Sequence, residues 1–232
     1  MTYRGRTLLG ALLLAATVVP AAAAQAQEPA PGTFSCRASA IKAPILGEPF
    51  IANDQYTPCR DSHKALLSGV GIGSDKANEL TVRASVLTAT TEEDPVASET
   101  GEVVRGGAAS ASVAHAYVNA FNLIKLNVFG ISSTAGRKCL PNGSSDPDIG
   151  GSSAIAHITL NGRPLPVSIP LRIPLLIGTL YTNYAQKSNG EVLTRAVWLD
   201  LAGDRNDVIL GEARGRADGV DCTPEPVTEP AP

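Results

Sequence analysis

Asp61, Ser62 and His63 carry the three side-chain types of a hydrolytic triad: a carboxylate, a hydroxyl and an imidazole. A working triad is a matter of geometry, and adjacent residues of a strand or loop rarely converge on one another. The chain also contains no G-x-S-x-G sequence, the pattern that presents a nucleophilic serine on a sharp turn. We therefore predict no catalytic residues.

His115 and His157 are the other two histidines, and they fall on different expected strands. The two imidazoles could meet across a sheet, but a metal ion would need a third and a fourth ligand. The chain has no H-E-x-x-H spacing and no C-x-x-C pair. We therefore expect neither a metal site nor a cofactor.

Two acidic segments are further candidates for chemistry. Residues 142–151 form a polar loop with Asp146 and Asp148, but Gly150 stands where a calcium loop needs its third ligand. Residues 92–94 are three adjacent acids before a proline. We expect a solvated turn in the first case and a solvated face in the second.

Trp198 is the single tryptophan of a chain in which aromatic residues make up 4 %. We expect it to be a core anchor on a central strand and not a platform for stacking sugars. Charged residues make up 18 % and the formal net charge is -3. A nucleic-acid-binding domain should carry a basic footprint, so this composition excludes nucleic acid as a partner.

Residues 1–26 have the pattern of a signal peptide for export. Arg4 and Arg6 precede an uncharged apolar stretch, residues 8–19, which is shorter than the about 20 residues of a membrane span. The small residues 24–26 then form an A-x-A site, after which we predict cleavage. The mature chain is expected to be secreted, free or associated with the cell surface, and without a transmembrane anchor.

Four cysteines, an even number, agree with export, because exported chains usually form disulfides. Cys36, Cys59, Cys139 and Cys222 allow three pairings, and the sequence alone does not choose among them. We favour Cys36 with Cys59, which closes a short N-terminal loop. We favour Cys139 with Cys222, which ties the middle of the fold to its last strand.

Between residues 33 and 222, apolar residues recur mostly at every second position, the period of a half-buried strand. Asn161-Gly162, between two such runs, is a strong hairpin signal. We therefore predict an all-β domain over 33–222: an antiparallel β-sandwich, with a jelly roll as one form, stapled by two disulfides. A flexible lead, 27–32, would precede it, and a disordered proline-rich tail, 223–232, would follow.

The alternation also assigns faces to individual side chains. It places Val86 on one face with Leu80, Val82 and Ala84, and it places His115 on one face with Val113. The expected strands fall within residues 80–86, 111–118, 124–128, 153–160, 192–199 and 208–214.

The order of these segments resembles the choice-of-anchor P family of secreted, mainly actinobacterial surface proteins. The resemblance covers about residues 33–222. It is carried by the segments 108–128, 133–139, 158–167, 190–201 and 207–214, the last of which continues to Cys222. It implies an exported β-rich module whose relatives use varied C-terminal anchors, and it brings no enzymatic activity. This chain departs from the pattern, because no recognisable anchor follows Cys222.

Together these features predict an exported, non-catalytic β-sandwich module of the cell envelope or medium, with a structural or binding role. Cell-wall or surface components are its candidate partners. One alternative is an extracellular hydrolase of glycan or ester substrates that uses carboxylates or His63 brought together by the fold. Another is a protein-binding adhesin or inhibitor that uses a strand edge or the segment 168–174.

Overall fold

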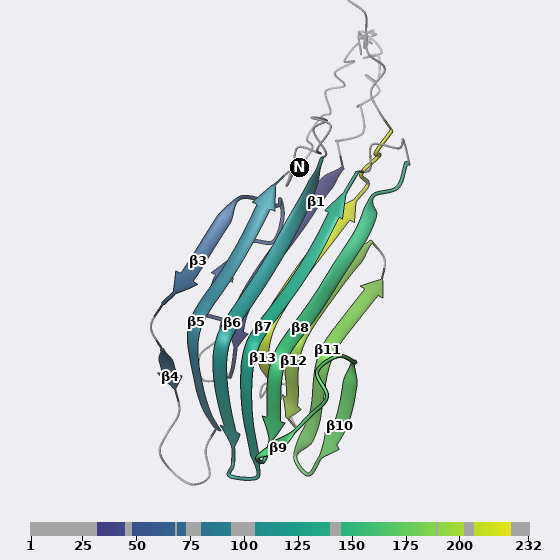
Figure 1. Cartoon of the computed structure of the whole chain (residues 1–232). Coiled ribbons are helices and arrows are strands. Elements are labelled where there is room, and N and C mark those ends of the chain that lie inside the picture. Colours follow the sequence, from purple (N-terminus) through teal and green to yellow (C-terminus); the bar gives the residue numbers. More distant parts are fainter. Residues whose placement is uncertain are drawn as a thin grey trace, which may run out of the picture. The chain divides into compact units, whose positions relative to one another are not determined.

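The computed structural model describes residues 32–44, 48–67, 69–72, 80–93, 105–139, 145–188, 190–201 and 207–223. The expected signal peptide lies outside the described residues, as do nearly all of the expected lead and tail. Strands are the only regular secondary structure in the described part of the chain (Figure 1). None of its residues belongs to a helix that could span a membrane.

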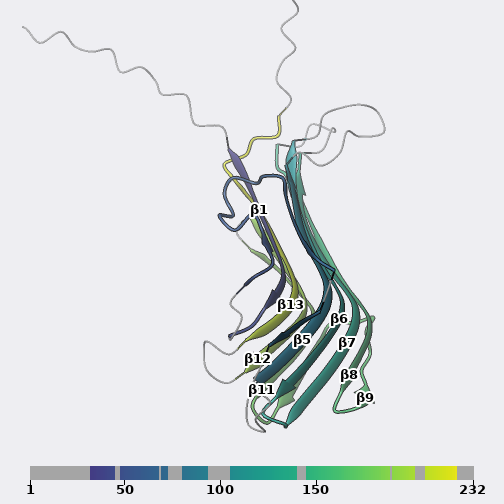
Figure 2. The ribbon, with the colours of Figure 1, turned by 90° about the vertical axis from the view of Figure 1, so that its left-hand side faces the viewer.

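Two antiparallel sheets pack face to face, which confirms the predicted all-β sandwich (Figure 2). The six-stranded sheet has the order β10-β11-β12-β13-β1-β2. The seven-stranded sheet has the order β3-β5-β6-β7-β8-β9, with β4 also paired to β5. The strands are β1 (Thr33–Lys42), β2 (Ile51–Ala52), β3 (Ser62–Leu66), β4 (Val70–Ile72), β5 (Leu80–Glu93), β6 (Gly106–Ala120), β7 (Ile124–Lys138), β8 (Asp148–Leu160), β9 (Arg163–Pro164), β10 (Leu171–Leu175), β11 (Gly178–Ser188), β12 (Glu191–Leu201) and β13 (Val208–Asp218).

Each long strand changes the face that it buries about halfway along its length. In β7, for example, Leu126 and Val128 are buried before the change, and Ile131 and Ser133 are buried after it. Gly130 lies between them with a φ of 60° in the left-handed region. That one residue rotates the strand, so the side chains that follow it point to the opposite faces.

The changes of face form one line across each sheet. Because every neighbouring strand changes at the same level, the pairing has the same register on both sides of the line. Figure 2 shows the resulting bend in the seven-stranded sheet. We call these two rows of residues the kink lines. One contains Val86, Ala114, Gly130 and Ala156, and the other contains Asn183, Ala196, Gly211 and Ala40.

The kink lines correct two of the predicted faces. Val86 has a φ of 48° and is 41 % exposed, whereas Val82 and Ala84 of the same strand are buried. His115 is likewise on the outer face, although Val113 is buried. The predicted alternation is correct on each side of the line and wrong across it.

The kink lines also divide the core into two halves of different composition. Toward the end with the β6–β7 turn, which we call the turn end, the sheets bury large aliphatic side chains such as Leu126, Ile158 and Leu199. Toward the opposite end, beyond Leu87, Val113 and Ile131 next to the line, they bury small ones such as Ala111 and Ala135. Small side chains let the two backbones approach closely, so this half gains less apolar burial per residue.

Two disulfides fasten the half with the small core residues, which we call the disulfide end. Cys36 is bonded to Cys59 and Cys139 to Cys222, as the favoured pairing predicted. The second bond joins the end of β7 to the segment after β13, across the two sheets. Disulfides of this kind are typical of chains that fold in an oxidising environment.

Candidate binding face

Asp61, Ser62 and His63, the side-chain types of a hydrolytic triad, do not converge on one another. Asp61 accepts a hydrogen bond from the backbone N–H of Glu93 at 2.8 Å, which fixes the carboxylate beside the end of β5. Ser62 and His63 are successive residues of β3, so their side chains point to opposite faces. His63 pairs with Thr90 at the edge of the sheet.

The two strand histidines share one row of the seven-stranded sheet, but an aromatic ring separates them. His115 stacks on Phe129 with ring centroids 4.4 Å apart, and His157 lies on the other side of that ring at 6.1 Å. The Nε2 atom of His115 is 2.6 Å from Oδ1 of Asn127. Within the described part of the chain, no group of three or more His, Cys, Asp or Glu residues is placed to hold a metal ion.

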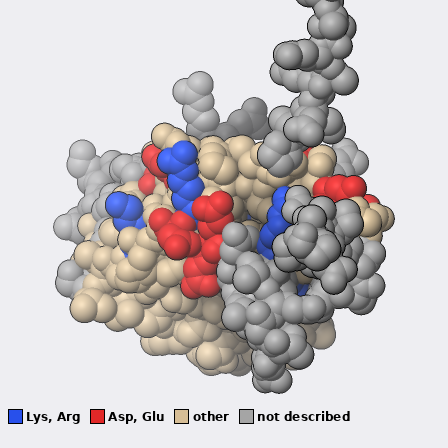
Figure 3. All heavy atoms as spheres, turned by 90° about the horizontal axis from the view of Figure 1, so that it is seen from above, with Lys and Arg blue, Asp and Glu red and all other residues tan. Residues whose placement is uncertain are grey.

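The acidic segments lie at the disulfide end. Glu92 and Glu93 are exposed at the end of β5, and Asp148 begins β8 opposite Lys138. Figure 3 looks onto this end and shows acidic side chains beside basic ones. Residues 142–144 and Asp94, the remainder of these candidates, lie outside the described residues.

Trp198 does not belong to the core, which corrects the expectation from the sequence. Its neighbours Val197 and Leu199 are both buried in the core, and Trp198 points to the outer face of the six-stranded sheet. Its ring stacks on that of Tyr181, the opposite residue on β11, with centroids 4.6 Å apart. Tyr184 meets the same ring edge-on at 5.3 Å.

Arginine side chains cover both ends of this aromatic stack. The guanidinium of Arg195 lies over the Trp198 ring, 4.5 Å from its centroid, and that of Arg172 lies 5.8 Å from the centroid of Tyr181. Trp198 also donates a hydrogen bond from Nε1 to Asp207 at 3.1 Å. Tyr181 and Arg195 therefore cover the tryptophan ring. The Arg195 side chain is itself only 11 % exposed, whereas Arg172 is exposed.

The kink line is what brings these side chains together. In a regular strand, residues three positions apart point to opposite faces. Tyr181 and Tyr184 are three apart, yet their rings meet because Asn183 lies between them with a φ of 50°. Arg195 and Trp198 are related in the same way across the kink line.

A buried carboxylate holds Arg195 in place. Glu212 of β13 is 3 % exposed, although it is on the outer face, and its two oxygens accept from Arg195 at 2.7 Å and Arg214 at 2.9 Å. Burial alone would raise the pKa of Glu212, but the charges of Arg214 and Arg195 and their hydrogen bonds lower it below its ordinary value. Glu212 is therefore ionised and both arginines are fixed.

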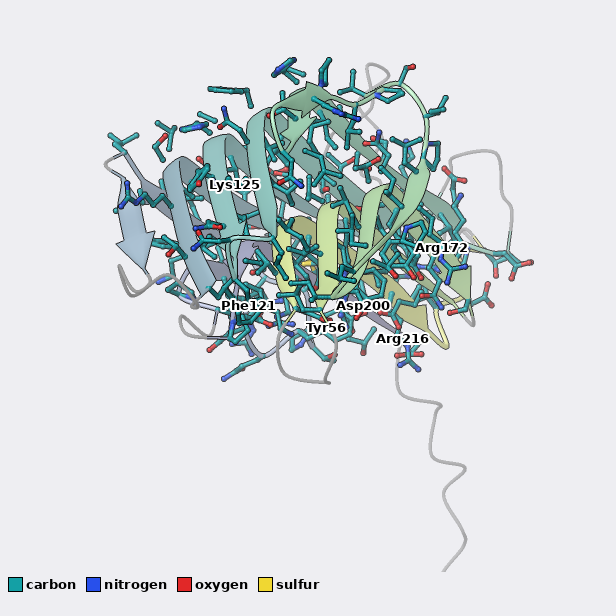
Figure 4. All side chains as sticks on the ribbon, turned by 90° about the horizontal axis from the view of Figure 1, so that it is seen from below. Tyr56, Phe121, Lys125, Arg172, Asp200 and Arg216 are labelled. Atoms are coloured by element: carbon teal, nitrogen blue, oxygen red, sulfur yellow. A yellow bond between two sulfur atoms is a disulfide. The ribbon has the colours of Figure 1, made fainter. Side chains whose placement is uncertain are left out.

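We call Arg172, Tyr181, Tyr184, Arg195 and Trp198 the aromatic–arginine face. Figure 4 looks along the sandwich from the turn end and labels Arg172 together with Asp200 and Arg216 of the same outer surface. This face was not predicted from the sequence, because Trp198 was expected in the core. The spacing of three in Tyr181-x-x-Tyr184 and Arg195-x-x-Trp198 is the signal that would have located it.

Comparisons with known proteins add nothing to this description: no family model, no curated protein and no solved structure matches the chain.

Proposed function

We propose that this chain is an exported, non-catalytic module that binds a partner in the cell envelope or medium through the aromatic–arginine face. The observation that carries the proposal is the prearranged stack of Trp198, Tyr181 and two arginines on an outer sheet surface. Tyrosine, tryptophan and arginine dominate the binding energy of protein interfaces. Side chains already held in place also lose little conformational entropy when a partner binds.

Two further observations support the location outside the cytoplasm. Both pairs of cysteines form disulfides, which persist in oxidising compartments. The signal-peptide pattern of residues 1–26 agrees with them, and so does the resemblance to the choice-of-anchor P family, which stays a prediction. Cell-wall and surface components are then the partners that the face would meet.

The exposed chemistry of the face favours a partner that brings acidic or planar groups. Neither face of the Trp198 ring is free to stack on a sugar ring, because Tyr181 and Arg195 cover both. Arg172, in contrast, is exposed beside the Tyr181 ring and can bind a carboxylate or phosphate. The hydrolase alternative has less support, because Asp61 is hydrogen-bonded to the backbone of Glu93 and the side chains of Ser62 and His63 point to opposite faces.

Binding to isolated cell walls and to secreted proteins tests the proposal. The exported chain should bind one of these fractions, and Trp198→Ala and Arg172→Ala should each weaken binding at least tenfold. Phe129→Ala is the matched control, because Phe129 is an exposed, stacked aromatic residue on the opposite sheet. Circular dichroism before and after heating shows whether each variant is folded.

Two results would overturn the proposal. In the first, Arg172→Ala and Trp198→Ala are folded and bind as the unchanged chain does. In the second, Phe129→Ala loses as much binding as Trp198→Ala, so that the opposite sheet contributes equally.

A further inference from the structure

The edge of β8 lacks a neighbouring strand over most of its length. β9 pairs only with Thr159 and Leu160, at one end of β8. Near the other end, the carbonyl of Ile149 accepts a hydrogen bond from Nζ of Lys187 at 3.0 Å. Between these points, from Gly150 to His157, no described residue pairs with the outward backbone groups of β8.

The other sheet edges carry devices that prevent pairing with another chain. β10 contains Pro174 and the charged Arg172, and β9 contains Arg163 and Pro164. β3 contains Lys64, and its edge is interrupted before β4 begins. Short strands, prolines and positive charges are the usual protection of a free edge.

β8 has none of these devices between its ends. Residues 149–156 include no charged residue and no proline, and consist of glycine, serine, alanine and isoleucine. Ser152, Ala154 and Ala156 are exposed and too small to block an approaching strand. A long, uncharged and unobstructed edge is a template for strand addition.

We propose that the free edge of β8 pairs with β8 of a second copy of this chain, in antiparallel orientation about a twofold axis. In a symmetric pair each edge meets itself, so any charge on it enters the interface twice and faces its own copy where it lies at the axis. The absence of charge over residues 149–156 removes that cost for self-pairing. A foreign peptide, in contrast, would find no charged or bulky group on this edge to select it.

The neighbouring strand of the other sheet adds to the contact. β10 pairs with β11 only as far as Thr182, so no strand of the described part of the chain pairs with the outward groups of Tyr184–Ser188. β8 and β11 lie side by side, as the 3.3 Å contact from Ser153 Oγ to Asn183 Oδ1 shows. A second copy docked here covers both edges and forms roughly eight backbone hydrogen bonds along β8 alone.

Sedimentation velocity of the chain without the expected signal peptide, residues 1–26, tests the proposal. We expect a concentration-dependent dimer, and Ala154→Lys should weaken it at least tenfold because each copy would bring an ammonium group into the uncharged edge. Ser112→Lys is the matched control: Ser112 is exposed in the same cross-strand row but on the central strand β6. It should leave the dimer unchanged.

Hydrogen exchange supplies a second readout. The outward amides between Gly150 and His157 should become protected as the concentration rises, and those of β6 should not change. A monomer at every concentration overturns the proposal, as does a dimer that Ala154→Lys leaves intact. If the chain is monomeric and the edge becomes protected only when secreted proteins are added, then the edge binds a foreign peptide and not a second copy.

Discussion

Replacing Gly130 with alanine should be far more costly than replacing Gly162, although both glycines have left-handed backbones. Gly130 has a φ of 60° and lies in the kink line of the seven-stranded sheet, whereas Gly162 has a φ of 79° in the β8–β9 turn. A Cβ at Gly162 would meet nothing within 4 Å. A Cβ at Gly130 would lie 2.7 Å from the Cβ of Ala156 on the neighbouring strand.

The difference between the free energies of unfolding of the two variants measures the cost of the close contact between residue 130 and Ala156. A left-handed backbone costs an alanine about 1–2 kcal/mol, and this cost applies to both positions. Only Gly130→Ala adds a carbon–carbon contact well inside the usual 3.5–4.0 Å. Overpacking of this kind costs about 1–3 kcal/mol, so we expect a total loss of about 2–5 kcal/mol for Gly130→Ala.

Urea unfolding under non-reducing conditions, followed by the fluorescence of Trp198, gives the free energy of unfolding of each variant. Ala156→Gly in the Gly130→Ala background should recover the part of the loss that comes from the contact. If Gly130→Ala costs no more than Gly162→Ala, or if Ala156→Gly restores nothing, then the contact with Ala156 is not the reason for glycine at this position.

The ion pairs and the disulfides give further predictions. Glu212→Gln should destabilise the chain by about 3–5 kcal/mol, because it leaves Arg195 and Arg214 without their carboxylate. Since the pKa of Glu212 is lowered in the folded chain, its stabilisation is present above the ordinary carboxyl pKa of about 4.3 and is lost as the pH falls through the folded value. Unfolding measured against pH should therefore show a smaller acid loss for Glu212→Gln than for the unchanged chain, and equal slopes would contradict this assignment. Replacing Cys139 and Cys222 together with serine opens a loop with a sequence separation of 83 residues and should cost roughly 4–5 kcal/mol in the same urea assay; a loss below about 1 kcal/mol would contradict the chain-entropy argument.

The fold class could be predicted from the sequence because its signals are local, whereas the disulfide pairing was a preference among three possibilities that the structure confirms. Alternating runs located β5, β6, β7, β8, β12 and β13, and Asn161-Gly162 correctly predicted a turn, in which Asn161 has a φ of 50°. The aromatic–arginine face could not be found in this way. A period of two implies that residues three apart lie on opposite faces, and only the kink at Asn183 places Tyr181 and Tyr184 together.

The kink lines could not be predicted from the sequence of any single strand. Glycine at 130 and 211 is suggestive, but Val86 and Asn183 serve the same purpose in the neighbouring strands. Each kink line exists because neighbouring strands change their buried face at paired positions, which preserves the register between them. Which positions are paired depends on how the strands align in the sheet, and the sequence of one strand does not give that alignment.

Because both disulfides lie at one end of the sandwich, the redox state of the surroundings acts on one half of the molecule. The half with Leu126, Ile158 and Leu199 buries more apolar surface per residue, so we expect it to collapse without oxidation more readily than the half with Ala111 and Ala135, where both disulfides lie. A reduced chain should then be digested by protease first at the disulfide end, and the oxidised chain at neither half. If the chain is exported, as we propose, the disulfide end would close only where the surroundings are oxidising, after the chain has left the cytoplasm.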